Sequence, residues 1–363
     1  MNRLINFSCN VVLLLCLAFV SKAQQSIKLN YTNAHGLTMI GKAEKSTMFF
    51  HRLDTSAHKS IPRVIRSLAT NSAGLAISFT TNSSSISAKW CTSKQATANN
   101  MTGIAYEGMD LYIKRDGRWQ YAGVARPVSH DCSEAMIVEN MMPGEKECLL
   151  FLPTYDEVLS LSVGVDQGAE LRPGNNPFKK QILVYGSSIV QGASASRPGL
   201  AYPAKLSRES GYNFINLGFS GNAKLEASVA DMIAAMPMDA IILDCVPNPS
   251  PEELLARTNY LISTIRRLHP KIPIVCIQSV AREKANFDTV VAARVALKDK
   301  YFKQEVNKLQ KQDKDLYLIE ADGLLGKDQE GTTDGIHPND LGFDRMLQKI
   351  KPRILEILKL YQI

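Results

Sequence analysis

The stretch QILVYGSSIVQG, residues 181–192, decides the fold of the second half of the chain. It begins with an apolar run typical of a buried strand, then turns on Gly186, presents Ser187 and Ser188, and closes on Gly192. More apolar runs follow, and each is separated from the next by residues with helical periodicity. Strands that alternate with helices pair in parallel, so this half is predicted to form a three-layer α/β/α domain.

The elements of this domain can be placed by residue range. Strands are expected at 181–185, 213–217, 239–244, 272–277 and 315–319. Helices are expected at 225–236, 251–268, 287–312 and 342–361, with a further helix near 200–210. Ligands bind at the carboxyl ends of the strands in such a sheet, so the loop YGSSIVQG (185–192) is the first candidate site.

The first half of the mature chain follows a strand-and-turn pattern instead. Three stretches alternate apolar and polar residues: GLAISFTTNSSSISAKW (74–90), GMDLYIKRDGRWQYAGVA (108–125) and ECLLFLPTYDEVLSLSVGV (147–165). Asp116-Gly117 is a strong hairpin signal, and no long helical period is present, which favours an all-β, jelly-roll-like sandwich. We therefore expect a β-sandwich accessory domain at 24–175 and a catalytic domain at 176–363, joined by the Gly-, Pro- and Asn-rich stretch 166–180.

The beginning of the chain has the features of an export signal. Arg3 supplies positive charge, VVLLLCLAFV (11–20) is an apolar core too short to span a bilayer, and SKA (21–23) ends the segment with small residues. We expect a signal peptide at 1–23, cleaved after Ala23, and a protein exported to the periplasm or the extracellular space. No other apolar stretch is long enough to predict a membrane span.

Composition narrows the classes of partner and cofactor. The 363 residues are 45% apolar and 21% charged, as in globular proteins, and the net charge of +7 comes without a basic cluster, which argues against nucleic acid as a partner. The sequence leaves the oligomeric state open.

Five cysteines remain after signal cleavage: Cys91, Cys132, Cys148, Cys245 and Cys276. This odd number cannot form a complete disulfide framework, and no CxxC or His-Cys grouping predicts a zinc site. Cys245 and Cys276 lie in apolar runs and are expected to be buried. Cys132 and Cys148 are the candidate disulfide pair, and the sequence leaves open whether they pair.

The opening loop does not fit three well-known loop motifs. A phosphate-binding loop requires lysine and a hydroxyl residue after its second glycine, where this chain has Ala193 and Ser194. The G-x-G-x-x-G dinucleotide pattern is absent, and the G-x-S-x-G elbow fails because Val190 stands at its last position. A serine in this loop can still act as a nucleophile if a base and an orienting acid lie nearby.

One histidine lies at the carboxyl edge of the predicted sheet, where the opening loop also lies. Six histidines are available: His35, His51, His58, His130, His269 and His337. The first four lie in the β-rich half, and His269 ends a predicted helix, where a solvated cap is expected. His337 lies in TTDGIHPNDLGF (332–343), a loop after the last strand and thus at the same edge as the opening loop, with Asp334 three residues before it.

These residues carry a resemblance to a known family. YGSSIVQGASASRPGLAY (185–202) resembles the first signature block of the SGNH, or GDSL-type, serine esterases. NLGFSGN (216–222) resembles their second block, and DGIHPNDLG (334–342) resembles their last, in which Asp and His stand three apart. Together the blocks span most of 181–363, and the resemblance implies a flavodoxin-like SGNH hydrolase domain. An N-terminal β-sandwich also occurs in bacterial members that accompany polysaccharide breakdown.

The resemblance assigns roles to residues of this chain. It implies Ser188 as the nucleophile, His337 as its base and Asp334 as the partner of His337, while Ser187 occupies the position of Asp in the family name. It implies an oxyanion hole made of the backbone N–H groups of Ser188 and Gly221 and the amide of Asn248. The loop that contains Asn248, DCVPNPSPEE (244–253), departs from the family pattern Gly-x-Asn-Asp, because Val246 and Pro249 replace its Gly and Asp.

The implied activity is hydrolysis of acyl esters through an acyl-serine, with no metal or organic cofactor required. An acylated glycan is the expected substrate, with O-acetyl as the simplest acyl group. Two alternatives stay open: an esterase or thioesterase acting on lipid-like small esters, and a catalytically inactive glycan-binding protein. The intact Ser188, Asp334 and His337 argue against the inactive protein.

Overall fold

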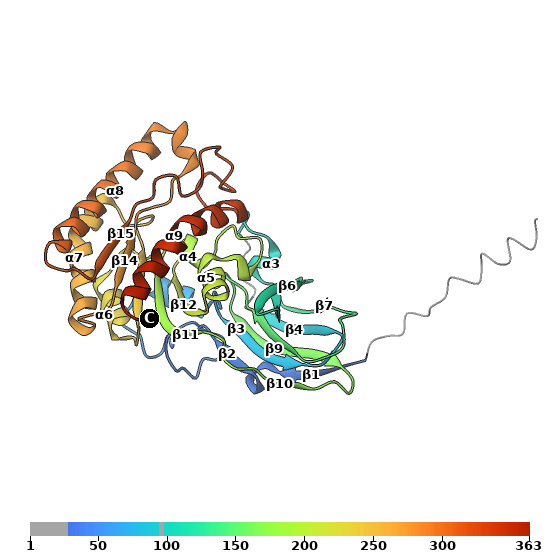
Figure 1. Ribbon diagram of the computed structural model, residues 1–363. Helices are drawn as coiled ribbons and strands as arrows, with labels where there is room; N and C mark the ends of the chain where they lie inside the picture. The colour runs from blue at the N-terminus through green and yellow to red at the C-terminus, as the bar shows by residue number, and fades with distance from the viewer. Residues whose placement is uncertain (1–27, 94–97) are drawn as a thin grey trace, which may run out of the picture.

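The computed structural model of the protein describes residues 28–93 and 98–363, and the expected signal peptide at 1–23 lies outside them. An antiparallel β-sandwich is followed by a parallel sheet with helices on both faces (Figure 1). The predicted fold class is confirmed. Within the described ranges, no helix is both long enough and apolar enough to cross a bilayer.

The sandwich consists of two antiparallel sheets. One has the order β1 (Leu29–Asn33), β9 (Val158–Asp166), β4 (Ile86–Thr92) and β7 (Cys132–Val138). The other has the order β10 (Leu171–Pro173), β3 (Ala76–Thr81), β8 (Lys146–Phe151), β5 (Met109–Arg115) and β6 (Arg118–Ala125), and β2 (Thr38–Ile40) also pairs with β3. Alternate side chains of the two sheets fill the core between them. The expected linker at 166–180 contains β10, so part of it belongs to the sandwich.

The predicted hairpin turn at Asp116-Gly117 is confirmed. Arg115 of β5 pairs with Arg118 of β6, and the two residues between them have φ angles of 51° and 74°. This is the left-handed geometry that two-residue hairpin turns favour and that Asp-Gly adopts readily.

The cysteines pair differently from the candidate pair. Cys91 forms a disulfide with Cys132, its direct neighbour in the ladder between β4 and β7, whereas Cys148 is free and buried on β8. A Cys132–Cys148 bond is therefore wrong, because the two residues belong to different sheets. Cys245 and Cys276 are buried and free, as expected.

The second half of the chain contains a five-stranded sheet in which all strands are parallel. Its order is β12 (Tyr212–Gly218), β11 (Lys179–Gly186), β13 (Ala240–Asp244), β14 (Ile274–Ile277) and β15 (Leu316–Ile319). Leu183 and Tyr185 point to one face, where they pack with α6 (Ala227–Ala235), α7 (Pro251–Leu268) and α8 (Thr289–Gln310). Ile182 and Val184 point to the other face, covered by α4 (Ser188–Gln191), α5 (Tyr202–Ser210) and α9 (Asp340–Leu360).

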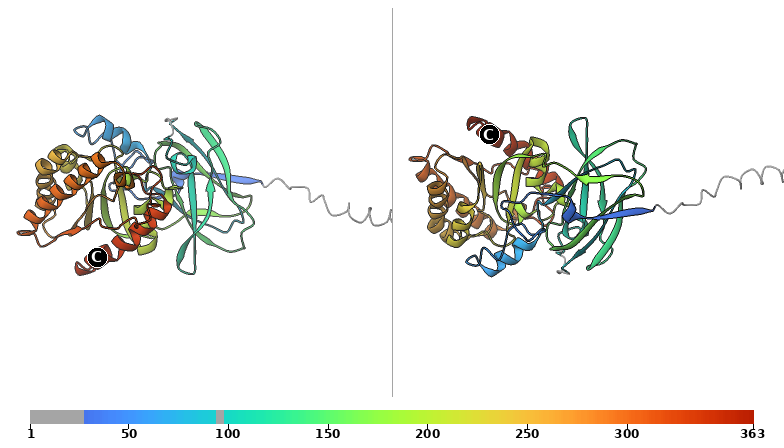
Figure 2. Two further views of the ribbon diagram at one scale, coloured as in Figure 1. Left: turned by 90° about the horizontal axis from the view of Figure 1, so that it is seen from above. Right: turned by 90° about the horizontal axis from the view of Figure 1, so that it is seen from below.

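The shorter helices connect these layers. They are α2 (Arg63–Thr70), α3 (Gly103–Tyr106) and the 3₁₀ turns η2 (Ala34–Gly36), η3 (Pro198–Leu200) and η4 (Glu283–Asn286). Leu53, Ile61 and Ile65, in and before α2, pack in the same core as the β11 side chains of the parallel sheet. In Figure 2 the light-blue α2 lies against the α/β half. Residues of the expected accessory domain thus help to cover the parallel sheet, and a domain boundary at 175/176 stays a prediction.

The two halves also meet across the outer face of the six-stranded sheet. Tyr112 of β5 and Phe151 of β8 pack with Ala204 of α5, and the guanidinium of Arg208 lies over the Tyr112 ring at 3.8 Å from its centroid. This contact packs the six-stranded sheet against α5, the helix that follows α4 in the chain.

Candidate active site

The opening loop forms a tight turn at the carboxyl end of β11. Ser187 is the N-cap of α4, and its hydroxyl accepts a hydrogen bond from the Ile189 backbone N–H at 3.2 Å. Ser188 is the first residue of α4 and is 7% exposed. A Cβ atom at Gly186 would lie 2.2 Å from the Asp244 carbonyl oxygen, so only glycine fits there. Ser187 therefore shapes the turn, and Ser188 presents its hydroxyl to the site.

The loop between β15 and α9 brings a histidine to the same edge of the sheet. Thr332 and Pro338 form an isolated antiparallel bridge, and the Thr333 N–H donates to the His337 carbonyl at 2.9 Å. Gly335 sits at the tip with a φ of 81°, which favours glycine. The loop thus folds back on itself and directs Asp334 and His337 toward the opening loop.

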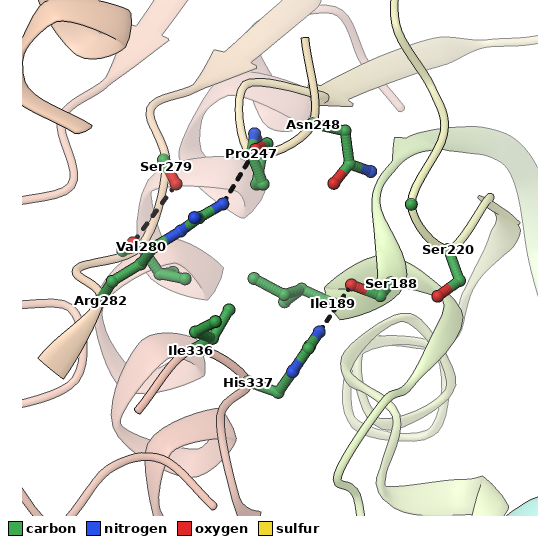
Figure 3. A pocket seen from close by; sticks show the side chains of 11 residues that line it. Ser188, Ile189, Ser220, Pro247, Asn248, Ser279, Val280, Arg282, Ile336 and His337 are labelled. Carbon is green, nitrogen blue, oxygen red and sulfur yellow. Dashed lines mark hydrogen bonds between the residues drawn. The ribbon is translucent and has the colours of Figure 1, made fainter. Parts of the chain in front are cut away.

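Three side chains from the two loops form one continuous chain of hydrogen bonds. Ser188 Oγ lies 2.9 Å from His337 Nε2, and the two side chains point toward one another (Figure 3). His337 Nδ1 lies 2.7 Å from Asp334 Oδ2. The Asp334 carboxylate accepts a hydrogen bond from the protonated Nδ1, which leaves Nε2 unprotonated and able to accept the Ser188 proton.

The Asp334 carboxylate is held in its ionised form. Burial raises the pKa of Asp334, but hydrogen bonds from the backbone and side chain of His337 and from Asn100 outweigh burial and bring the pKa down to about 2. The negative charge is therefore present at any pH near neutrality, as a partner for a protonated imidazole.

A small pocket opens beside this chain. It has a volume of about 280 Å³, and it is lined by Ser188, Ile189, Ser220, Gly221, Pro247, Asn248, Ser279, Val280, Arg282, Ile336 and His337. Gly221 has a φ of 67° in the loop after β12, and Asn248 lies in the loop after β13. The structure thus brings all five residues that the sequence assigned to the site to one place: Ser188, Asp334, His337, Gly221 and Asn248.

The loop that carries Asn248 is held by the buried Lys298 and the partly buried Arg282. Lys298 Nζ and Arg282 Nη2 donate to the Pro247 carbonyl at 2.8 and 2.9 Å. Asn248 Nδ2 donates to the Asn222 carbonyl, which leaves its second hydrogen for another acceptor. The loop therefore keeps an amide at the pocket even though Val246 and Pro249 depart from the family pattern.

Sequence reasoning missed two residues of this region. Arg282 follows β14, and its position after a strand of the parallel sheet was a signal that could have found it. Asn100 belongs to the β-sandwich half, and its Nδ2 lies 2.9 Å from Asp334 Oδ2. No pattern in the sequence indicates that contact, because it joins positions 234 residues apart.

Comparison with known protein families gives matches that agree with this geometry. The GDSL-like Lipase/Acylhydrolase family matches residues 179–355. The GxDLY family, described as the N-terminus of "Esterase_SGNH_hydro-type", matches residues 29–171. The motif in the name of the second family corresponds to GMDLY (108–112) at the start of β5. No curated protein gives a match.

Solved structures share the arrangement of both halves. A GDSL-like lipase candidate from Bacteroides ovatus ATCC 8483 is 53% identical, with a TM-score of 0.90 over 92% of this chain and 98% of that one. A family two carbohydrate esterase from Clostridium thermocellum, in complex with cellohexaose, is 15% identical, with a TM-score of 0.59 over 79% of this chain and 93% of that one. A family two carbohydrate esterase from Cellvibrio japonicus is 12% identical, with a TM-score of 0.60 over 93% and 99% of the two chains. At these lower identities the similarity establishes the fold.

Proposed function

Because this chain belongs to the GDSL-like lipase/acylhydrolase family, we propose that it is an exported serine esterase that removes acyl groups, above all O-acetyl, from carbohydrates. The observation that carries the proposal is the hydrogen-bonded chain from Ser188 through His337 to Asp334 at the edge of a small pocket.

The proposed reaction begins with attack of Ser188 Oγ on the ester carbonyl carbon. His337 Nε2 accepts the hydroxyl proton as the new bond forms, then returns it to the departing alcohol as the ester bond breaks. Such general acid–base catalysis contributes about 10²–10⁴-fold to the rate. Asp334 holds the imidazole in the required tautomer and stabilises its protonated form. Water, activated by the same imidazole, then releases the acid from the acyl-serine.

Negative charge develops on the ester carbonyl oxygen during the attack, and hydrogen-bond donors in the same pocket must stabilise it. The backbone N–H groups of Ser188 and Gly221 and the amide of Asn248 are placed around the pocket and supply them in this proposal. Loss of one such donor lowers turnover by about 10²–10³-fold in a serine protease. An Asn248→Ala variant is expected to show a loss of this kind.

The size of the pocket and the overall architecture support a short acyl group on a sugar. A volume of about 280 Å³ lies at the lower end of ligand pockets and suits an acetyl group better than a long acyl chain. The sandwich-plus-hydrolase arrangement is shared with carbohydrate esterases, one of them solved with cellohexaose. The apolar segment 11–20 and the small residues before position 24 support export.

The test is acetate release from a panel of acetylated polysaccharides, together with hydrolysis of nitrophenyl esters of increasing acyl length. We expect acetate release from at least one glycan, and a rate that falls steeply beyond short acyl chains. Ser188→Ala removes the activity, whereas Ser263→Ala, on the exposed face of α7, leaves it unchanged. A preference for long acyl chains would favour the lipid-like substrate class, and the absence of any Ser188-dependent hydrolysis would contradict the proposal.

A further inference from the structure

We propose that Asn100, a residue of the β-sandwich half, is a positioning residue of the catalytic site. Its side-chain amide donates to Asp334 Oδ2 at 2.9 Å and holds the carboxylate that orients His337. The inference rests on the proposed esterase function, and it gives the accessory half a direct part in catalysis.

The first argument is the set of donors around Asp334. Oδ1 accepts from the backbone N–H groups of Ile336 at 3.0 Å and His337 at 2.8 Å. Oδ2 accepts from His337 Nδ1 at 2.7 Å and from Asn100 Nδ2 at 2.9 Å. Each carboxylate oxygen therefore has two N–H groups, and Asn100 supplies the only one of the four that does not come from the loop itself.

The second argument is the orientation of the Asn100 amide. Its Nδ2 also lies 3.3 Å from His337 Nδ1. When Nδ1 carries the proton that it shares with Asp334, both nitrogens are donors, so this distance reflects two donors that converge on one oxygen. The opposite amide orientation would place Asn100 Oδ1 against the carboxylate and cause repulsion. The chemistry of the neighbours thus fixes which atom of Asn100 faces Asp334.

The third argument is that the backbone around Asn100 is anchored to the catalytic half. Ser194 Oγ donates to the Asn100 carbonyl at 3.0 Å, and Thr102 Oγ1 donates to the Ser196 carbonyl at 2.6 Å. The Ser196 N–H in turn donates to Asp340 Oδ1 at 2.9 Å, at the start of α9. These bonds connect the segment to the loop after Ser188 and to the helix after His337. Asn100 is therefore held in place rather than being a free surface amide.

Two charged residues of η4 that pack on the connection between β15 and α9 have partners other than Asp334. Glu283 of η4 accepts from the backbone N–H groups of Gly331 and Thr332, and Lys284 pairs with Asp288 at 3.7 Å. The hydrogen bonds around Asp334, Asn100 included, oppose burial and keep the pKa of this carboxyl low. Without Asn100, one oxygen loses a donor and the carboxylate can rotate away from Nδ1.

The test compares Asn100→Ala and Asn100→Asp with Asn99→Ala, the exposed neighbour, on a nitrophenyl acetate. We expect Asn100→Ala to lower kcat about 10-fold with KM changed less than about twofold, since one hydrogen bond to a charged group is lost. Asn100→Asp should lower kcat further and move the acid limb of the kcat/KM profile to higher pH, because a second carboxylate favours the protonated imidazole. Asn99→Ala should match the unsubstituted protein.

Thermal unfolding midpoints check that the variants fold, and the rate of Ser188 labelling by a fluorophosphonate reports nucleophile activation without ester turnover. We expect this labelling rate to fall in both Asn100 variants. Unchanged kcat, pH profile and labelling rate in both folded variants would overturn the inference while leaving the esterase function intact. A raised KM at unchanged kcat would overturn it too, because Asn100 would then contact the substrate. Absence of Ser188-dependent activity and labelling in the unsubstituted protein would overturn the proposed function itself.

Discussion

At the scale of single residues, the surroundings of two carboxylates shift their pKa values in opposite directions. Asp334 is partly exposed and receives four N–H groups, which lower its pKa to about 2 despite burial. Asp244, at the end of β13, is 1% exposed, and burial raises its pKa to about 7, against the effect of the Tyr202 hydroxyl that donates to it. Asp334 is therefore ionised at neutral pH, whereas Asp244 is a neutral acid in the core at pH values below about 7.

The role of Asp334 predicts the effect of Asp334→Asn. The substitution keeps the shape of the side chain but can place an NH₂ group against Nδ1, so His337 adopts the tautomer that cannot accept the Ser188 proton. We expect kcat to fall by about 10³–10⁴-fold with little change in KM. Asp328→Asn, on the same connection between β15 and α9 but at the surface, is the control. Steady-state kinetics on an acetyl ester would contradict this role if both variants kept full activity.

The environment of Asp244 predicts a pH-dependent change in stability. Its folded pKa of about 7 lies above the model-peptide value of 3.8, so the folded state binds the additional proton in this window and wild-type stability falls as pH rises from about 4 to 7. Asp244→Asn keeps an oxygen for the Tyr202 hydroxyl and cannot ionise. We expect the variant to be more stable than the wild type at pH 8 and close to it near pH 4, as measured by urea denaturation. An equal difference at both pH values would show that ionisation of Asp244 is not the cause.

At the scale of elements, β5 joins the sandwich to the loop after the nucleophile. Asp110 of the GMDLY motif is fully buried, and it accepts from the Gly199 N–H at 2.8 Å and pairs with Arg197 at 3.2 Å. The charge of Arg208 on α5 also lowers the Asp110 pKa, although burial dominates and raises it to about 6. The motif thus supplies the negative charge that balances two arginines at the contact between the halves.

This contact predicts a large effect for Asp110→Ala. The substitution leaves two partly buried arginines without the counter-charge of the buried Asp110, and such losses cost about 3–5 kcal/mol of unfolding free energy. Glu139→Ala, exposed at the end of β7, should change the unfolding free energy by less than about 0.5 kcal/mol. Urea denaturation of both variants checks this, and similar small effects in both would mean that Asp110 does not hold the halves together.

The sequence predicted most of the elements because their periodicity is local. The helix expected at 251–268 has those bounds in the structure, where Ser250 and Glu253 form a capping box, and all five parallel strands were found near their expected positions. The short helix α2 was missed because eight residues give too brief a helical period. The Cys91–Cys132 bond and the Asn100–Asp334 contact were missed for another reason. Both depend on which strands and loops become neighbours in space, and the spacing of residues does not encode this.

The grouping of Ser188, His337 and Asp334 could be predicted from the sequence because the sheet topology brings their loops together. In a parallel sheet every loop after a strand lies at the same edge, so the loops after β11 and β15 had to be near each other. The donors around Asp334 and the cations behind Pro247 were not accessible, because they depend on side-chain packing in three dimensions. The sequence therefore predicted that Ser188, Asp334 and His337 lie at one edge of the sheet, but it did not predict the contacts of Asn100 and Arg282.

At the scale of the whole molecule, the two halves share a core and a site. Arg52, 2% exposed, lies in the first half and donates to the carbonyls of Leu68, Asn71, Asn216 and Gly218. Burial lowers the pKa of Arg52 to about 9, so it remains a cation at neutral pH. It connects the segment around α2 to the end of β12, which Phe219 separates from Ser220 and Gly221.

This sharing predicts that the protein unfolds as one unit. We expect a single calorimetric transition, with no separate unfolding of the sandwich. Leu53 and Ile65 of the first half pack in the core of the parallel sheet, so unfolding of the first half alone would expose this core to water. A chain limited to residues 176–363 is expected to be unstable and to lack esterase activity. Two well-separated transitions, or a stable and fully active fragment, would show that the halves are independent.

The measurement that tests the central claim most directly is the site of covalent modification during turnover. The protein is mixed with an activated acetyl ester, quenched in acid within the steady state, digested and analysed by mass spectrometry. The account predicts an acetyl group on Ser188, absent from Ser188→Ala and still formed in Ser187→Ala, and slower to hydrolyse in Asp334→Asn. Acetylation at a different residue under steady-state turnover, or ester hydrolysis that persists in Ser188→Ala, would contradict it.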